Sequence, residues 1–123
     1  MANQGDQPLL FVAADTESHA DHGRFTNAIE LAKEAKEQGD DVRIIFDGAG
    51  TRWIPELSRA EGGYKWKNFA AVRDVVAGAC AFCAGAFGVK EAVKAAGIPL
   101  LSDYEGHPSL RGLIAQGYQV ITF

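Results

Sequence analysis

The stretch "AGACAFCAGAFGVKEAVKAAG", residues 77–97, decides the fold. Its first part, 77–83, is a run of small and apolar residues that is typical of a buried strand. Its second part, 86–96, carries apolar residues at helical spacing and ends at Gly97, because glycine often stands just past a helix end. A buried strand followed by an amphipathic helix is one unit of an alternating α/β fold.

The same alternation continues in both directions along the chain. Short apolar runs predict strands, and apolar residues at a period of 3.6 predict helices. The expected strands are 8–14, 41–47, 77–83, 98–102 and 118–123, and the expected helices are 25–38, 54–59, 67–76, 86–96 and 107–116. Right-handed crossovers between parallel strands then predict one α/β domain over residues 1–123, a three-layer α/β/α arrangement of the flavodoxin-like type. Its mainly parallel sheet is expected to hold about five strands.

The composition restricts the classes of partner. The chain has 123 residues, 12 of them basic and 16 acidic, for a net charge of −4. Nucleic-acid binding is not expected, because a phosphate-binding surface needs clustered Lys and Arg. No apolar run is long enough to span a membrane. The beginning "MANQGDQPLL" lacks the features of a signal peptide, so a cytoplasmic protein with reduced thiols is expected.

Both cysteines of the chain lie where the predicted strand 77–83 leads into a helix. In open parallel sheets, ligands bind beyond the carboxyl ends of the strands. The amides at a helix N-terminus stabilise an anion, so Cys80 is expected to be an accessible, stabilised thiolate. Cys83, one turn further on, is expected to be more buried and less reactive. Small neighbours such as Gly85 leave room for a substrate sulfur atom.

Two other interpretations of the cysteine pair compete with a reactive thiol. A structural zinc site needs four ligands, and the histidines are far from the cysteines in the sequence, so neither a metal site nor a cofactor is expected. These histidines are His19, His22 and His107. A thioredoxin-like dithiol and an inert, packed pair both remain open.

Two polar loops are expected at the same edge of the sheet as the cysteines. They are residues 15–23 and 47–52, and each follows a predicted strand. Loop residues are more often solvated than functional, but these are the candidates for lining the site. The candidates are Asp15, His19, His22, Asp47 and Arg52. The segment "DGAG" (47–50) lacks the full phosphate-loop pattern, so nucleotide binding is not favoured.

The segment "CAFCAGAFG", residues 80–88, resembles the C-x-x-C-x(4)-G segment of the DsrE/DsrF-like sulfur-relay family, close to its YchN-like branch. The opening strand and helix and the ending "GHPSLRGLIAQGYQVITF" (106–123) are also similar to the family. The resemblance implies the same α/β fold and a homo-oligomer, often a trimer or hexamer. In members that transfer sulfur, it implies a persulfide on the cysteine that Cys80 matches. Cys83 matches a second cysteine that only some members have.

Two functions therefore remain. The first is a persulfide carrier or sulfurtransferase-relay subunit that acts through Cys80, with sulfur-donor and sulfur-acceptor proteins as partners. The alternative is a non-catalytic oligomeric protein that binds a small molecule or a protein partner, with structural cysteines. Whether the protein is an enzyme stays open. Solvent exposure of the Cys80 sulfur is the property that separates the two.

Overall fold

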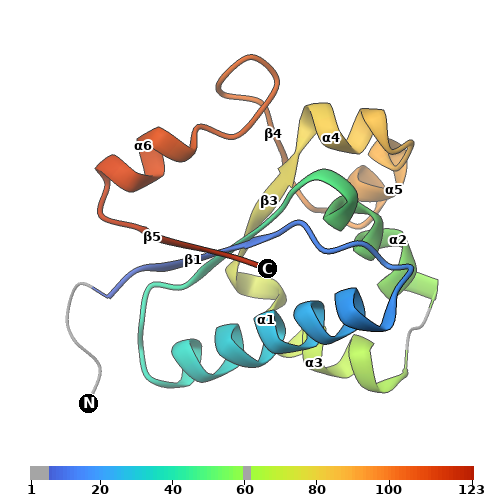
Figure 1. Cartoon of the computed structure of the whole chain (residues 1–123), viewed down its shortest axis with the longest axis horizontal. Coiled ribbons are helices and arrows are strands. Elements are labelled where there is room, and N and C mark those ends of the chain that lie inside the picture. Colours follow the sequence, from blue (N-terminus) through green and yellow to red (C-terminus); the bar gives the residue numbers. More distant parts are fainter. Residues whose placement is uncertain (1–5, 60–61) are drawn as a thin grey trace.

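A five-stranded, all-parallel sheet forms the centre of the computed structural model, which describes residues 6–59 and 62–123 (Figure 1). The strand order is β4-β3-β2-β1-β5. The strands are β1 (Pro8–Val12), β2 (Arg43–Phe46), β3 (Val76–Cys80), β4 (Leu100–Leu101) and β5 (Gln119–Thr122). In the parallel register Leu10 lies opposite Ile44 and Ile121. The predicted parallel sheet of about five strands is confirmed.

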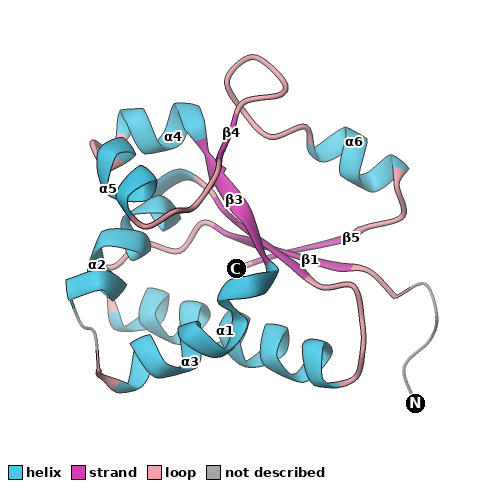
Figure 2. Cartoon of the chain, turned by 180° about the vertical axis from the view of Figure 1, so that it is seen from behind, coloured by secondary structure: helices cyan, strands magenta, loops and turns pink. Residues whose placement is uncertain are grey.

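Helices cover both faces of the sheet. Helices α1 and α3 lie on one side and α6 on the other, as both views show (Figures 1 and 2). The helices are α1 (His19–Glu37), α2 (Trp53–Arg59), α3 (Tyr64–Val72), α4 (Ala81–Ala86), α5 (Lys90–Ala95) and α6 (Leu110–Ala115), with 3₁₀ turns at Gly48–Arg52 and Arg73–Val75. The three-layer α/β/α architecture is therefore confirmed. None of the helices in the described ranges is long and apolar enough to cross a membrane.

The main core lies between the sheet and helices α1, α2, α3 and α5. Trp53 is fully buried in it, stacks on Phe25 with ring centroids 4.0 Å apart, and donates its Nε1–H to the carbonyl of Ala14 at 2.8 Å. Strand residues alternate between the faces: Leu10 belongs to this core, while Ile45 lines a cavity beside α6 on the other face. Burial of both faces explains why the central strands β1 and β2 are apolar runs rather than strict alternations.

Helix α1 begins earlier than the apolar pattern predicted. The side chain of Ser18 accepts a hydrogen bond from the backbone N–H of Asp21 at 3.1 Å and caps the helix, which therefore starts at His19. The expected loop 15–23 is shorter for this reason. The apolar spacing only starts at Phe25, so it could not reveal the polar first turns.

The segment 81–96 also differs from the expectation. The strand ends at Cys80 rather than at residue 83, and the residues expected to complete it begin helix α4. The helix expected over 86–96 is shorter, because only Lys90–Ala95 forms α5. Gly88, with φ at +71°, stands between α4 and α5 in a conformation that residues with a Cβ rarely adopt. Because the strand ends early, Cys80 is the last residue of β3 and Cys83 lies in the first turn of α4.

Candidate functional site

Cys80 stands at the junction of β3 and α4. Its Sγ accepts a hydrogen bond from the backbone N–H of Cys83 at 3.4 Å, so the thiol itself caps the helix. Helix α4 has only six residues, so this single amide, rather than a long helix dipole, acts on the sulfur. The residue is completely buried, with 0% of its surface exposed. The sulfur is therefore fixed in place and shielded from water.

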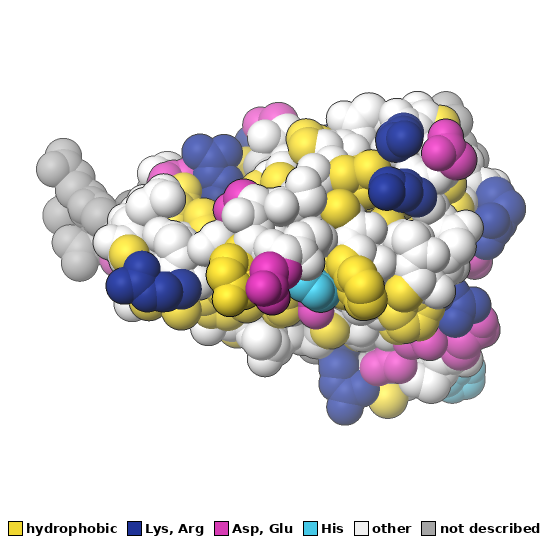
Figure 3. All heavy atoms as spheres, turned by 90° about the horizontal axis from the view of Figure 1, so that it is seen from above, with side chains coloured by type: hydrophobic (Ala, Val, Ile, Leu, Met, Phe, Trp, Pro, Cys, Tyr) yellow, Lys and Arg dark blue, Asp and Glu magenta, His cyan; other side chains and the backbone are white. Residues whose placement is uncertain are grey.

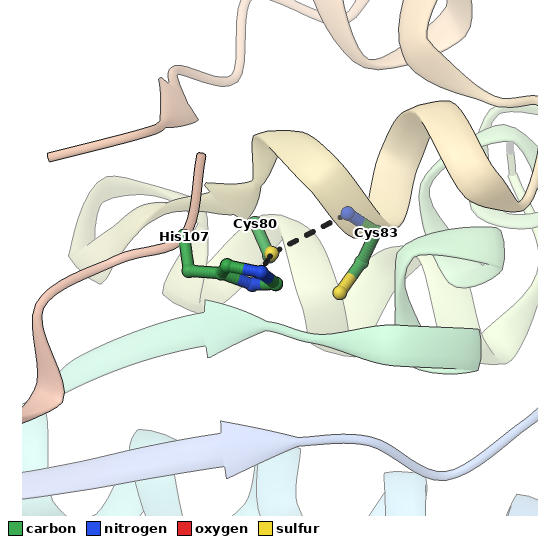
Figure 4. A group of neighbouring side chains, drawn as sticks. All are labelled: Cys80, Cys83 and His107. Carbon is green, nitrogen blue, oxygen red and sulfur yellow. Dashed lines mark hydrogen bonds between the residues drawn. The ribbon is translucent and has the colours of Figure 1, made fainter. Parts of the chain in front are cut away.

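His107 supplies the third polar group of the site. Its Nδ1 lies 3.3 Å from the Cys80 Sγ. Figure 4 shows the imidazole beside this sulfur. The loop between β4 and α6 carries this histidine, and Tyr104 and His107 exchange two backbone hydrogen bonds of 2.8 Å that fix the loop. The ring packs against Phe82 with centroids 4.9 Å apart. A thiol and an imidazole at this distance are within hydrogen-bonding range, which is the arrangement in which a histidine can serve as the base for a cysteine nucleophile.

Cys83 has a different environment from Cys80. It is half-buried, and its thiol donates a hydrogen bond to Oδ1 of Asp47 at 3.5 Å. Burial raises the pKa of the Cys83 thiol to about 12, with further contributions from the hydrogen bond to Cys80 and the negative charge of Asp47. At neutral pH, Cys83 is therefore a protonated thiol and a poor nucleophile.

The burial of the two cysteines is the reverse of what the sequence predicted. Cys80 was expected to be accessible and Cys83 more buried, whereas Cys80 is buried and Cys83 is half-buried. Both expectations are wrong for a physical reason. As the helix cap, Cys80 turns its side chain back under α4, and the loop that carries His107 lies against the sulfur.

Two of the expected pocket residues lie close to the cysteines. Asp47 follows β2 directly and reaches Cys83, so the sheet brings this carboxylate to the site as expected for neighbouring parallel strands. Gly85 lies within α4 and is exposed, and a Cβ added there would meet nothing within 4 Å. The space beside Gly85 is therefore open rather than occupied by neighbouring side chains.

The other expected pocket residues gather in a separate corner of the same edge. Arg52 pairs with Asp15 at 3.2 Å, so these two loops do meet. His22 donates its Nε2–H to the carbonyl of Thr16 at 2.6 Å. His19 is exposed at the first position of α1. These contacts join side chains to one another and to the backbone, and none of them reaches either cysteine.

Sequence reasoning set His107 aside because it is distant from the cysteines along the chain. The signal that could have found it is topological. β3 and β4 are adjacent and parallel, with Cys80 opposite Leu101, so the loop after β4 must arrive at the carboxyl end of β3. A histidine in that loop is a natural neighbour of a cysteine at the end of β3.

Two large aromatic side chains are exposed beside the site. Phe82 and Tyr104 are exposed by 60% and 63%, and each comes from an element that forms the site. Figure 3 shows hydrophobic side chains on both sides of a histidine on this face, with acidic side chains beside it. Large exposed aromatic rings are enriched where proteins meet partners.

Comparisons with known proteins agree on the family and the fold. The chain is 37% identical over 91 residues, 74% of its own length and 73% of the other's, to the uncharacterized protein MJ0733 of Methanocaldococcus jannaschii. It is 26% identical over 103 residues to the ESX-1 secretion system protein EccA1 of Mycolicibacterium smegmatis, and that match spans 80% of this chain but only 16% of EccA1.

One solved structure shares the fold. It is a conserved protein of unknown function, BT1422 from Bacteroides thetaiotaomicron, with a TM-score of 0.63 and 16% identity over 99% of this chain and 100% of that one. The model of the DsrE/DsrF-like family matches residues 10–123, from the first strand to the last residue. The chain therefore belongs to the DsrE/DsrF-like family.

Proposed function

We propose that this protein carries sulfur as a persulfide on Cys80. The observation that supports the proposal most directly is the contact of 3.3 Å between the Cys80 Sγ and the Nδ1 of His107. The imidazole is within reach of the Cys80 thiol proton, and the backbone N–H of Cys83 donates to the sulfur at 3.4 Å, so the site offers a base for the proton and a donor for the attacking sulfur. Family membership supports the same reading, because the family includes sulfur-relay proteins.

The transfer step conserves atoms and charge. The Cys80 thiolate attacks the terminal sulfur of a donor persulfide, a new S–S bond forms, and the donor's S–S bond breaks. The donor leaves as a thiolate, and His107 holds the proton that the Cys80 thiol gave up. An acceptor nucleophile then removes the terminal sulfur by the same reaction in reverse, which restores the Cys80 thiolate.

The state of Cys83 protects such a persulfide. A Cys83 thiolate would attack the inner sulfur, form a Cys80–Cys83 disulfide and release hydrosulfide. Because its pKa is raised to about 12, the Cys83 thiol stays protonated at neutral pH and attacks slowly. Its hydrogen bond to Asp47 also engages its proton. We therefore assign Cys83 a protective role rather than a resolving one.

Delivery of sulfur to Cys80 requires the covering loop to move. Cys80 has no exposed surface in this conformation, and His107 lies half-buried over it. The exposed rings of Phe82 and Tyr104 border this loop and provide an apolar docking surface for a sulfur donor, an acceptor or a second copy of the chain.

The test is direct loading of the folded, reduced protein with cysteine persulfide. Intact mass measurement should show a gain of one sulfur atom per chain, and peptide mapping after alkylation should place it on Cys80. Cys80→Ala should abolish the gain, and Cys83→Ala should retain it. Loading on Cys83 alone, or equal loading of the Cys80→Ala variant, contradicts the proposal.

The complete burial of Cys80 favours a second candidate, a non-catalytic protein in which the cysteines only pack. Buried free cysteine is a common core residue, so this function needs no chemistry at the thiol. Alkylation of the folded protein separates the two candidates. If Cys80 reacts only after unfolding, the packing role holds and the persulfide carrier is excluded.

A further inference from the structure

Three soft or borderline ligand atoms converge at the site. The Cys80 Sγ, the Cys83 Sγ and a ring nitrogen of His107 all lie within 4.8 Å of one another. They come from the end of β3, the first turn of α4 and the loop after β4, so three separate elements meet here. Figure 4 shows both sulfur atoms and the imidazole on the same side of the start of α4.

The separations suit a tetrahedral metal ion. Zinc–sulfur bonds of about 2.3 Å and zinc–nitrogen bonds of about 2.0–2.1 Å place two tetrahedral ligand atoms roughly 3.5–3.8 Å apart. Cys80 and His107, at 3.3 Å, are already close to that spacing. The longest separation, at most 4.8 Å, closes with a small rotation of the half-buried Cys83 side chain.

The charge around the three atoms also favours a cation. The Asp47 carboxylate lies 3.5 Å from the Cys83 Sγ and adds negative charge beside the thiols. Arg52, five residues further along the chain, is held by Asp15 and Glu17 instead. With both thiols ionised, the site would hold three negative charges near one neutral imidazole, which a divalent cation offsets.

We propose that Cys80, Cys83 and His107 bind one Zn²⁺ ion, with the fourth position left to water or an added thiol. Binding releases the two thiol protons to solvent, and no electron is transferred. A site with three protein ligands and one open position keeps the metal exchangeable. The partial exposure of Cys83 gives the ion a route to the ligands.

Zinc and a donor persulfide compete for the Cys80 sulfur. Coordination to zinc withdraws electron density from this sulfur and lowers its rate of attack on a donor persulfide. The zinc proposal does not depend on the persulfide proposal, because it requires only that the three ligand atoms reach one ion. The two proposals can therefore fail separately.

The test uses reduced, metal-free protein titrated with Zn²⁺ by calorimetry and with Co²⁺ by absorption spectroscopy. We expect one ion per chain and, with Co²⁺, the thiolate charge-transfer and intense d–d bands of a tetrahedral sulfur site. His107→Ala and Cys83→Ala should each weaken binding by at least about tenfold, the smallest loss seen even for outer partners of metal ligands. His19→Ala, which changes an exposed histidine outside the site, should bind like the parent.

Each outcome decides between the proposals. Binding without thiolate bands, or binding that His107→Ala and Cys83→Ala leave unchanged, overturns the zinc site. Cys83→Ala should lose zinc and still accept sulfur from cysteine persulfide. Sulfur loading without zinc binding rejects only the metal, and zinc binding without sulfur loading rejects only the carrier. Circular dichroism of each variant checks that the fold is intact.

Discussion

Two corners at the carboxyl edge of the same sheet each place a histidine against an aromatic ring with centroids 4.9 Å apart. In the supporting corner, His22 packs against Trp53 and donates to a backbone carbonyl. In the thiol corner, His107 packs against Phe82 and faces the sulfur of Cys80. A carbonyl does not change its protonation state, whereas a thiol does. The group that each histidine contacts, rather than the histidine itself, therefore determines which corner can take part in a reaction.

The largest effect is expected in the supporting corner. Trp53→Ala removes a fully buried ring and should lower the free energy of unfolding by about 3–5 kcal/mol. Trp53→Phe should cost less, because it retains an aromatic ring against Phe25 and loses the hydrogen bond to Ala14. Urea denaturation measures both. Buried aromatic residues usually contribute several kcal/mol. If Trp53→Ala lowers the free energy of unfolding by less than about 1 kcal/mol, the supporting corner does not stabilise the fold as described.

A matched pair of histidine variants tests the contrast directly. His107→Gln removes the imidazole beside Cys80 while a long side chain still covers the buried sulfur, and a hydrogen bond to a charged group contributes about 1.5–3 kcal/mol. The alkylation rate of Cys80 at neutral pH should therefore fall by roughly 10- to 100-fold. His22→Gln should leave that rate unchanged. Equal rates in the two variants would remove the functional distinction between the corners.

The pH dependence of stability sharpens the description of Cys83. Its pKa is raised by burial and by the hydrogen bond to Cys80, from 9.0 to about 12, so the folded state holds the proton more tightly than the unfolded state does. This contribution to stability is complete below pH 9.0 and is lost as the pH rises from 9.0 through about 12. The parent should lose more stability over this interval than Cys83→Ala. Parallel unfolding curves for the two proteins would contradict the raised pKa.

The smallest effect is expected at Arg52. Its ion pair with Asp15 is partly exposed, and such pairs contribute under about 1 kcal/mol. Arg52→Gln should therefore change the free energy of unfolding by less than that amount and leave Cys80 alkylation as it is. A slower reaction of Cys80 in this variant would show that the two corners are coupled.

The sequence predicted the sheet well because its central strands, β1 and β2, are largely buried on both faces. Apolar runs marked every strand, and the all-parallel pairing followed from the alternation with helices. Helix ends were predicted less well. Ser18 begins α1 ahead of the apolar spacing that starts at Phe25, and Gly88 separates α5 from α4, which lies where the apolar run predicted the end of a strand. Helix capping and positive φ values depend on single residues, so the spacing of apolar residues does not predict them.

The site was predicted in part, since the cysteines and Asp47 were chosen from their positions after strands. The burial of Cys80 was missed because it depends on which way one capping side chain turns. His107 was missed as a partner because its approach is a property of strand order rather than of spacing along the chain. Strand order emerges only when the whole sheet assembles.

The loop that carries His107 lies between β4 and α6 and belongs to neither. Two backbone hydrogen bonds between Tyr104 and His107 close it upon itself, so its shape is largely its own. In evolutionary terms, the sequence of this loop can change without a change in the strands of the sheet. A descendant that replaces it presents a different side chain to the same cysteine without rebuilding the sheet. A protein engineer can graft a carboxylate, a second thiol or an inert residue there and read out the change at one sulfur atom.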